Sequence, residues 1–525
     1  MSALANQDKE GEEDDTTNKA SPLPEIDADI QSLPIITAQA WSALQKANDP
    51  PYLFRHGGSI VRLEPDEEGG RIMRELNLDA TRYELARVAR WVRERKGNKG
   101  AVEWEDAKPP IDVVKDLLAT PTYPLPAITR ITQVPVFASN GELQTEAGYH
   151  ATAKVYYSPA NEFVIADVPK NPSSEDIAKA RSLIIDDLLC DFPFVSDADR
   201  AHAVGLFLLP FARDLIVDAT PCHLIEAPTP GSGKSLLADV ALRPAVGRNI
   251  GVVTQARDGD EWRKRLTARF KELREVILID NVTTTLDSGE LASALTALNW
   301  EDRILGRTET ASLPVRCVWV CTANNPMMST EIARRCIRIR LDTGIDRPWI
   351  AEKGYKHPDL RKWVDEHRIE LVWAALVLIQ AWLVADRPKP QCKLLGSYEE
   401  WTRTIGGILE NAGIKGFLTN LDEFYEAADI EGAIWKDFVE EWAEKHGSKI
   451  VTVATLFNIA NNNDGFEFSG SSERGQRISF GKQLARQRDR VIGEHRIVDF
   501  GTVKRAKQWR LLPLAPASSD EPPQE

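Results

Sequence analysis

A short run of glycine, lysine and serine has the residue types that hold nucleotide phosphates. It reads Pro230-Gly231-Ser232-Gly233-Lys234-Ser235. An apolar stretch precedes it and a predicted helix follows, which is the setting such a loop requires. Glycine lets backbone N–H groups converge on phosphate oxygens, and the amino end of the helix points at the same anion. Lys234 would neutralise β- and γ-phosphate charge and Ser235 would bind Mg²⁺, so the run predicts an ATP site with Mg²⁺ as cofactor.

One position departs from the usual GxxxxGK[ST] pattern, because Pro228 stands where the first glycine is expected. That position lies before the tight turn, where the fixed φ of proline is tolerated. A chance match in a surface linker is the alternative interpretation. The flanking strand and helix favour the phosphate loop.

A second signal is a buried strand that ends in an acid. Residues 276–279 are apolar and lead to Asp280, 46 residues beyond Lys234. A carboxylate at the end of such a strand can hold Mg²⁺ beside the phosphates. The next residue, Asn281, could position water without acting as a base, so Glu261, Asp280 and Glu301 remain open as candidates for the hydrolytic base.

Two further groups follow along the chain. Asn324 ends the apolar run that begins at residue 315 and is expected to face the γ-phosphate; turn formation is its alternative role. Arg334 and Arg335 precede a predicted strand at 336–341. Either arginine could reach into a neighbouring subunit's ATP site or form a surface ion pair, and both interpretations stay open. Within that strand, Arg338 and Arg340 are expected to line a solvated face.

The order of these motifs resembles that of the AAA+ ATPases. It runs from the phosphate loop through Ile279-Asp280-Asn281 and Thr322-Ala323-Asn324-Asn325 to Arg334-Arg335. The resemblance is greatest to the superfamily III-like helicase modules of phage, plasmid and poxvirus primase-helicases, and more distant to minichromosome-maintenance helicases. It covers about 110–513 and is most specific at 223–341. It implies a hexameric homo-oligomer that couples ATP hydrolysis to unwinding of DNA during replication of a phage or mobile element. No acid cluster suggests a primase, so a separate primase or polymerase is a further expected partner.

Two regions are expected to contact single- and double-stranded DNA. Residues 300–310 are compatible with a β-hairpin that turns near Gly306, and in the helicases that this chain resembles such a hairpin enters the central pore; Arg303 and Arg307 are the matching cations. An ordinary surface hairpin is the alternative.

The second region is a predicted helix at 476–490 followed by a hairpin, which suggests a winged helix. Its apolar face is predicted to carry Phe480, Leu484 and Val491. Its phosphate-binding residues are predicted to be Lys482, Arg486 and Arg490 on the helix and Lys504, Arg505 and Lys507 on the wing. A solvated basic cap is the alternative.

The elements that must position these residues alternate between strand and helix from residue 176 to about 343, which indicates a parallel sheet covered on both faces. Ser173 and Asp176 resemble a capping box that opens a helix. Farther upstream, 59–63 reads as a strand and 82–95 as a helix. The predicted fold is α/β, an AAA+ P-loop core with an α+β amino-terminal domain, a helical region and a carboxy-terminal winged helix. The predicted boundaries are 1–35 (disordered), 36–175, 176–345, 346–450, 451–513 and 514–525 (disordered).

Composition narrows the class of protein. The chain has 525 residues, a formal net charge of −14 and 42% hydrophobic residues, which is ordinary globular composition. No apolar run reaches the ~18 residues of a membrane span, and residues 1–15 do not read as a secretory signal, so a soluble cytoplasmic protein is expected. Basic residues outnumber acidic ones by seven over 471–513, which favours a local nucleic-acid patch. The six cysteines are expected to be reduced.

Two rival functions remain. An ATP-switched initiator or loader would bind DNA without processive unwinding, and base-specific binding by residues 451–513 alone would favour it. An interaction protein with a degenerate ATP site is the other, and Asn281 is the residue that leaves it open.

Overall fold

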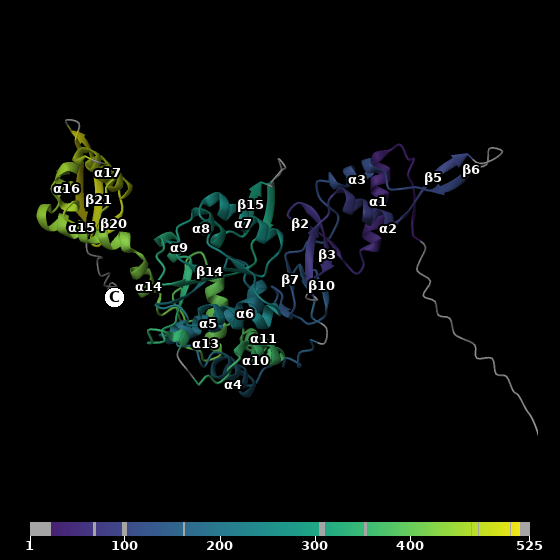
Figure 1. Ribbon diagram of the computed structural model, residues 1–525, viewed down its shortest axis with the longest axis horizontal. Helices are drawn as coiled ribbons and strands as arrows, with labels where there is room; N and C mark the ends of the chain where they lie inside the picture. Colours follow the sequence, from purple (N-terminus) through teal and green to yellow (C-terminus); the bar gives the residue numbers. More distant parts are fainter. Residues whose placement is uncertain are drawn as a thin grey trace, which may run out of the picture.

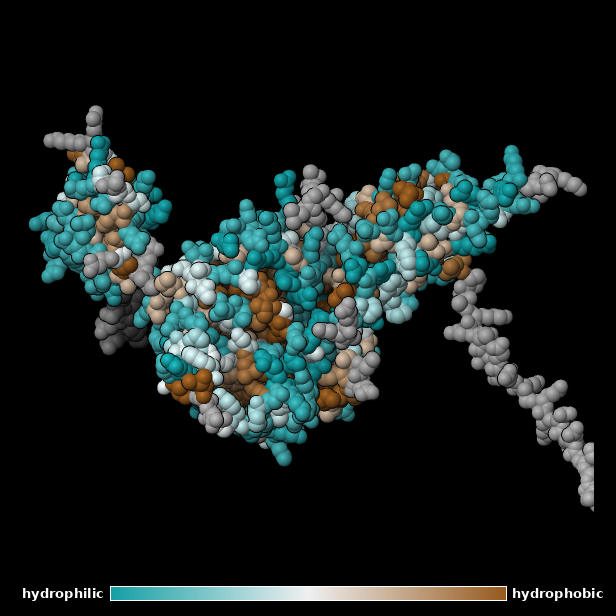
Figure 2. Space-filling view, in the orientation of Figure 1, coloured by the Kyte–Doolittle hydropathy of each residue, from teal (hydrophilic) through white to brown (hydrophobic). Residues whose placement is uncertain are grey.

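The computed structural model describes residues 23–66, 70–96, 102–160, 163–303, 310–350, 354–463, 465–470, 472–503 and 506–514. Three units follow one another along the long axis of the molecule (Figure 1). The central unit contains the predicted phosphate loop. Figure 2 shows that most of the visible face is hydrophilic, with hydrophobic residues gathered in patches on the central and amino-terminal units.

The central unit is built on a five-stranded parallel sheet of order β13-β14-β17-β12-β18. Its strands in chain order are β12 (Cys222–Ala227), β13 (Val252–Val253), β14 (Val276–Val282), β17 (Val318–Asn324) and β18 (Cys336–Arg340). The three middle strands are nearly continuous apolar runs and are buried on both faces, as parallel strands usually are. The predicted parallel sheet is therefore confirmed, and the carboxyl ends of β12, β14 and β17 meet at one edge.

Helices cover both faces of this sheet. One face packs against α4 (Ser174–Ser182), η2 (Leu183–Leu188), α5 (Asp197–Ala212), α6 (Lys234–Val246), α10 (Leu360–Glu366), α11 (Arg368–Val384) and α13 (Gly407–Asn411). The other face packs against α7 (Gly259–Lys271), α8 (Gly289–Thr296) and α9 (Thr330–Ala333). Ser173 and Asp176 form the predicted capping box at the start of α4.

The predicted helical region 346–450 is not a separate body, because α11 and α13 share one hydrophobic core with α5 and α6. Between them lie α12 (Glu399–Trp401) and η5 (Thr402–Gly406). Among the described residues no single helix is long and apolar enough to cross a membrane, although the bent pair α10 and α11 passes by length and composition. Most of α11 is buried inside the protein.

A two-stranded hairpin of β15 (Asn299–Arg303) and β16 (Thr310–Pro314) stands beside the sheet. Its root is fixed by Trp300, whose ring packs 5.9 Å from that of Phe270 and whose indole N–H donates to Thr267 Oγ1 at 2.8 Å. The predicted hairpin strands are therefore present, while the turn near Gly306 lies outside the described residues.

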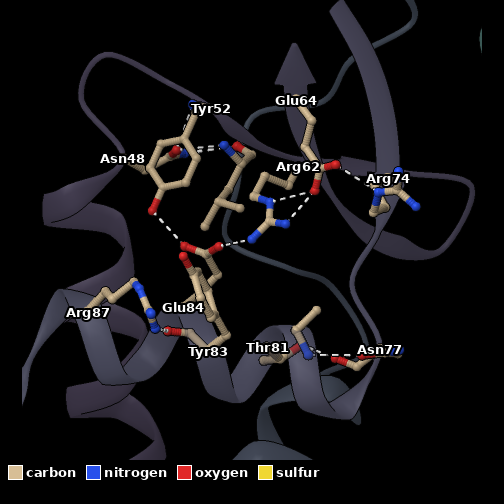
Figure 3. Close-up of polar contacts among 12 residues, drawn as sticks. Asn48, Tyr52, Arg62, Glu64, Arg74, Asn77, Thr81, Tyr83, Glu84 and Arg87 are labelled. Carbon is tan, nitrogen blue, oxygen red and sulfur yellow. Dashed lines mark hydrogen bonds and ion pairs between the residues drawn. The ribbon is translucent and has the colours of Figure 1, made fainter. Parts of the chain in front are cut away.

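The amino-terminal unit combines helices and short sheets. Its elements are β1 (Glu25–Asp27), α1 (Leu33–Ala47), β2 (Leu53–His56), β3 (Ser59–Pro65), β4 (Arg71–Glu75), α2 (Leu78–Val88), β5 (Arg90–Lys96), β6 (Val102–Asp106) and α3 (Ile111–Leu118). Figure 3 shows how α2 is fixed to β3: the buried Glu84 carboxylate accepts hydrogen bonds from Tyr52 and Arg62, and Arg62 also pairs with Glu64. A buried carboxylate needs such partners.

Two expectations for this unit need correction. Residues 25–35 are ordered, since they contain β1 and the start of α1. The helix expected over 82–95 ends at Val88, and β5 follows because Trp91 and Val92 pair with β1 and bury their side chains. After α3, the short strands β7 (Arg130–Thr132), β8 (Val136–Phe137), β9 (Leu143–Gln144), β10 (Gly148–His150) and β11 (Val155–Tyr157) join the unit to the sheet domain. Arg130 forms a buried ion pair with Asp214 at 2.6 Å.

The carboxy-terminal unit has its own hydrophobic core. It follows α14 (Leu421–Ala428) and contains α15 (Ile430–His446), β19 (Val451–Thr452), α16 (Val453–Ala460), α17 (Glu473–Arg486), β20 (Val491–Ile492), β21 (His495–Val503) and β22 (Ala506–Pro513). The core includes Trp435, Phe438 and Trp442 of α15, so the unit begins near residue 430 rather than at the expected 451.

Candidate nucleotide site

The phosphate loop connects β12 to α6 at the carboxyl edge of the sheet. Gly231 and Gly233 have φ values of +74° and +91°, a left-handed backbone that side-chain-bearing residues rarely adopt. A Cβ at Gly231 would also lie 3.0 Å from Trp349, in η4 (Pro348–Ile350). Both glycines are therefore required by the loop, and α6 begins directly at Lys234 with its amino end toward the loop.

Lys234 is mostly buried and lies between the loop and the next strand. Its Nζ donates to Thr229 O at 3.3 Å and to Asn324 Oδ1 at 2.7 Å. Burial lowers the pKa of the Lys234 ammonium, and the Asp280 carboxylate partly opposes that shift. A buried cation that has only neutral hydrogen-bond partners is well placed to receive an anionic phosphate. The structure thus brings Asn324, at the end of the strand that neighbours the Asp280 strand, to the phosphate loop.

The expected metal ligands also lie together. Ser235 Oγ donates to Asp280 Oδ1 at 2.9 Å, and Thr322 Oγ1 donates to the same oxygen at 2.6 Å. Asn281 has a φ of +55°, and its backbone N–H donates to Thr322 Oγ1 at 2.8 Å. A hydroxyl and a carboxylate next to a phosphate site are the ligands that Mg²⁺ prefers. Among the described residues no group of three His, Cys, Asp or Glu side chains could hold a metal. With one carboxylate and one hydroxyl, a bound Mg²⁺ would take its remaining ligands from phosphate oxygens and water.

Thr322 was not predicted from the sequence as a site residue. β17 pairs with β14 in parallel, and Ile279 lies opposite Cys321. The residues that follow these two, Asp280 and Thr322, therefore lie close together. The only signal was a hydroxyl residue inside an otherwise apolar strand. Thr322 fixes both the Asp280 carboxylate and the Asn281 backbone, which makes it a positioning residue for this site.

A cavity of about 220 Å³ opens beside the phosphate loop. It is lined mainly by apolar and aromatic side chains and the loop itself, including Phe192, Pro193, Leu236, Tyr355 and His357. A flat heterocycle attached to a phosphate chain would fit such a surface. Phe192 lies in the predicted helical lead-in, so the chain before the sheet contributes to the lining of this cavity.

The candidate bases Glu261 and Glu301 are held elsewhere. Glu261 pairs with Arg265 at 3.0 Å on α7, and Glu301 is an exposed residue of β15. No hydrogen bond joins either carboxylate to Lys234 or Asp280 within the described part of the chain. The structure therefore does not bring these two candidates into the group around Asp280.

Arg334 and Arg335 lie at the opposite edge of the sheet. The backbone N–H of Cys222, the first residue of β12, donates to Arg335 O at 2.9 Å. β12 then runs to Ala227, five steps of ~3.3 Å, so roughly 17 Å separates these arginines from the phosphate loop. Arg335 pairs with Glu331 at 3.3 Å, whereas the Arg334 side chain is exposed and its guanidinium has no hydrogen bond or ion pair among the described residues.

The expectation that Arg338 and Arg340 line a solvated face was wrong. Arg338 is 5% exposed and pairs with Glu423 of α14 at 2.8 Å. Arg340 pairs with Glu226 at 2.6 Å. Helix α14 covers this side of β18. The two arginines that alternate with apolar residues along the strand therefore form buried or half-buried ion pairs.

The candidate DNA-binding residues differ in whether their side chains are exposed or already engaged in an ion pair. Arg303 is exposed at the end of β15, and Arg307 lies outside the described residues, as do Lys504 and Arg505. Lys507 is engaged by Asp499 at 3.0 Å and lies over the Trp509 ring at 4.9 Å.

On α17, Lys482 and Arg486 are exposed opposite the buried Phe480 and Leu484, as predicted. Arg490 lies past the end of the helix and donates to Gln487 at 2.9 Å. Val491, expected on the apolar face, is instead an exposed residue of β20, because the helix ends at Arg486.

The comparisons with known proteins give distant similarities. No protein-family model matches the chain, and no curated protein matches it. The solved structures to which the chain is similar include the C-terminal region of NrS-1 in its apo A form, the active helicase Cch of SCCmec type IV, and JCV helicase. The NrS-1 region is 10% identical, with 91% of this chain and 98% of that chain covered and a TM-score of 0.34. Cch is 10% identical, with 88% and 97% covered and a TM-score of 0.32. JCV helicase is 16% identical, with 49% and 73% covered and a TM-score of 0.20.

Proposed function

We propose that this chain is an ATP hydrolase that drives unwinding of DNA, a helicase with an AAA+ core. The observation that carries the proposal is the single group formed by Lys234, Asn324, Ser235, Asp280 and Thr322, which come from three neighbouring strand ends. A cation, an amide, a hydroxyl and a carboxylate beside a phosphate loop are what hydrolysis of a nucleoside triphosphate requires.

Each residue has a distinct role in this proposal. The loop N–H groups and Lys234 hold the β- and γ-phosphates of ATP, and the cavity beside Phe192 receives the base. Ser235 and Asp280 hold Mg²⁺, which when bound neutralises charge on the phosphate oxygens. Asn324 and Asn281 are amides that orient water or the γ-phosphate.

The proposed assembly is a ring of identical subunits, expected to be a hexamer. Arg334 completes the ATP site of the adjacent subunit, since it lies too far from its own phosphate loop and its guanidinium is not tied to Glu331 as that of Arg335 is. In such a ring the β15–β16 hairpin, with Arg303 and Arg307, contacts single-stranded DNA in the centre. The helix–hairpin arrangement of the carboxy-terminal unit acts as a winged helix on duplex DNA. Replication of a phage or mobile element, with a separate primase or polymerase as a further partner, is the setting that the family resemblance suggests.

The first experiment compares ATP turnover with and without single-stranded DNA for wild type and Lys234→Ala. We expect DNA-stimulated hydrolysis in wild type and its loss in the variant, followed by ATP-dependent opening of a forked duplex by wild type. Hydrolysis that persists unchanged in Lys234→Ala would contradict the site assignment.

An ATP-switched initiator or loader is the second candidate, and the exposed Lys482 and Arg486 on α17 are the observation that favours it. In that case wild type would bind ATP and DNA but would neither hydrolyse ATP at a DNA-dependent rate nor open a fork. That result would replace the helicase proposal.

A further inference from the structure

The hairpin of β21 and β22 has an apolar end that the core of its unit does not cover. Ile497 and Trp509 are buried, whereas all four residues from Phe500 to Val503 are exposed. Phe500 keeps 50% of its surface exposed and Val503 keeps 51%. This end of the hairpin projects from the carboxy-terminal unit (Figure 1). Exposed apolar side chains that gather in one place often mark an interaction surface.

A β-bulge sets the position of Phe500. Asp499 pairs with Trp509 and Gly501 pairs with Gln508, so Phe500 is an extra residue against a single step of β22. Gly501 has a φ of +93°, which lets the backbone make this irregular step. A bulge re-aims a side chain relative to the regular alternation of a strand. Phe500 is therefore presented by a built feature of the hairpin and not by a loose loop.

Contacts that reach the core hold the bulge in place. The Gly501 N–H donates to Asp499 Oδ1 at 3.0 Å, and the Asp499 carboxylate pairs with Lys507 at 3.0 Å. The Lys507 ammonium lies 4.9 Å from the centre of the Trp509 ring, which is fully buried. In the part of the chain that the structure describes, no other aromatic ring packs against Phe500. A ring on a fixed support loses less conformational entropy when it binds a partner.

The charge of the surroundings indicates what the partner is. Basic residues outnumber acidic ones by seven over 471–513, and Lys482, Arg486 and Arg496 are exposed. A nucleic acid supplies both anionic phosphates for the cations and a flat apolar surface, the face of a base, for the ring. In a continuous duplex each base face is covered by its neighbours. At a fork, the first unpaired bases are free to stack on an aromatic side chain.

We propose that Phe500 stacks on an unpaired base at the junction between single- and double-stranded DNA, while the cations of α17 hold phosphates of the duplex. This inference rests on the proposed function, in which the carboxy-terminal unit binds DNA. Phosphate contacts are the same all along a duplex, so they cannot distinguish a fork from any other position. The ring gives the unit a preference for the fork.

The test compares Phe500→Ala and Phe500→Trp with Val491→Ala, which truncates an exposed apolar residue of β20 far from the end of the hairpin. The affinity of each full-length variant for a forked duplex is measured without ATP over a range of salt concentrations. A relaxed circular duplex, which has neither ends nor unpaired bases, serves as the competitor and gives the affinity for continuous duplex.

We expect Phe500→Ala to weaken fork binding about 10-fold, within the usual range for one base stacked on an aromatic ring, and to change affinity for the circle less than about twofold. The slope of log affinity against log salt concentration should stay at the wild-type value, because no phosphate contact is lost. Phe500→Trp should bind the fork as wild type does, since it keeps an aromatic ring, and so should Val491→Ala.

Forks that lack a single base then locate the contact. An abasic nucleotide is moved through the unpaired positions next to the duplex in each arm. At one position, wild type should lose as much affinity as Phe500→Ala loses on the intact fork, and Phe500→Ala should bind the abasic and intact forks equally. Losses that add independently at every position would overturn the inference.

The outcomes also separate this inference from the proposed function. Wild-type fork affinity in Phe500→Ala, with weaker binding in Lys482→Ala, would reject the role of Phe500 and leave the DNA surface on α17. Unchanged binding in both variants would reject DNA contact by the carboxy-terminal unit itself. Reduced self-association of Phe500→Ala with unchanged fork affinity would overturn the inference by assigning the hairpin to a contact with a second copy of the chain.

Discussion

Asn324 is the residue whose position says most about chemistry at the sheet edge. Its Oδ1 accepts from the Lys234 ammonium at 2.7 Å, so the amide N–H₂ is left to donate to a phosphate oxygen or to water. We expect Asn324→Ala to lower ATP turnover by about 100-fold, the usual cost of one preorganised donor, while ATP affinity falls much less. Turnover and affinity measured on the same preparation check this. Equal losses in both would show that Asn324 acts in binding rather than in hydrolysis.

His202 gives a prediction about stability and pH. It is fully buried, Nδ1 lies 2.7 Å from Arg338 O, and Nε2 accepts from the Leu418 N–H at 3.1 Å, so the neutral ring is satisfied. Burial lowers the pKa of His202 to about 4. The hydrogen bond to Arg338 O and the charge of Asp199 act in the opposite direction and raise the pKa, but by less than burial lowers it. Between pH 6.5 and 4 the unfolded chain therefore binds a proton that the folded chain does not.

The free energy of unfolding should accordingly fall with decreasing pH by up to about 1.4 kcal/mol per unit from this residue, and the effect should vanish above pH 6.5. His202→Asn keeps a side-chain donor but cannot titrate. Unfolding of the sheet domain at pH 7, 6 and 5 should show a shallower pH slope in the variant. Burial also lowers the pKa of His223, to about 3. This residue therefore adds a pH dependence of the same sign to the free energy of unfolding of both wild type and variant. Parallel slopes would contradict the assignment.

At the scale of elements, the loop at 393–398 joins two parts of the molecule. Tyr398 bonds to Leu295 O in the last turn of α8, and α8 leads directly into β15 of the hairpin. The same loop lines a cavity of about 370 Å³ together with Arg334 and Tyr425. A change at this cavity can therefore reach the hairpin through one hydrogen bond. We expect Tyr398→Phe to keep basal ATP turnover within about twofold and to lose most of its stimulation by single-stranded DNA, since a single buried hydrogen bond is worth about 1 kcal/mol.

The matched control is Tyr425→Phe. Tyr425 lines the same cavity, but its hydroxyl has no hydrogen-bond partner among the described residues. This variant should behave as wild type in both basal and stimulated turnover. If the two variants lose stimulation equally, the cause is a general disturbance of the cavity rather than the link to α8.

How far the sequence could predict these elements depends on whether the signal is local. The strands that carry Asp280 and Asn324 were predictable because buried parallel strands are continuous apolar runs, and the glycines of the phosphate loop mark its turn. The role of α14 over β18 was not predictable, since an ion pair between Arg338 and Glu423 joins residues 85 positions apart. β5 was mistaken for helix because its pairing with β1 overrides local preference.

The same limit applies within the site. Thr322 and Phe192 lie in segments whose own sequence shows only a strand and a lead-in to a helix. They become site residues because parallel pairing places Thr322 next to Asp280, and because the lead-in folds against the phosphate loop, where the Phe192 ring lies 3.5 Å from a Cβ built on Gly233. Likewise, the edge at which Arg334 lies follows from the direction of β12 and not from any feature of its neighbours in sequence.

At the scale of the whole molecule, the carboxy-terminal unit stands apart from the sheet domain with a core of its own, so its charges can act on DNA independently of the ATP site (Figure 1). α17 offers a direct comparison between cations on one helix. Lys482 and Arg486 are exposed and have no ion pair among the described residues, whereas Arg477 pairs with Glu473 at 2.9 Å. A cation that is already neutralised releases fewer counterions when it meets a phosphate.

We therefore expect Lys482→Ala and Arg486→Ala each to reduce the slope of log affinity for duplex DNA against log salt concentration by about 1, the value for one lost phosphate contact. Arg477→Ala should change it much less. Full-length protein and a fluorescent duplex of arbitrary sequence suffice, because phosphate contacts do not depend on sequence. ATP turnover without DNA should stay at the wild-type rate in all three variants. A uniform slope across the series would place the duplex contact on another surface, and the unit's separate core would then serve a purpose other than holding α17 against DNA.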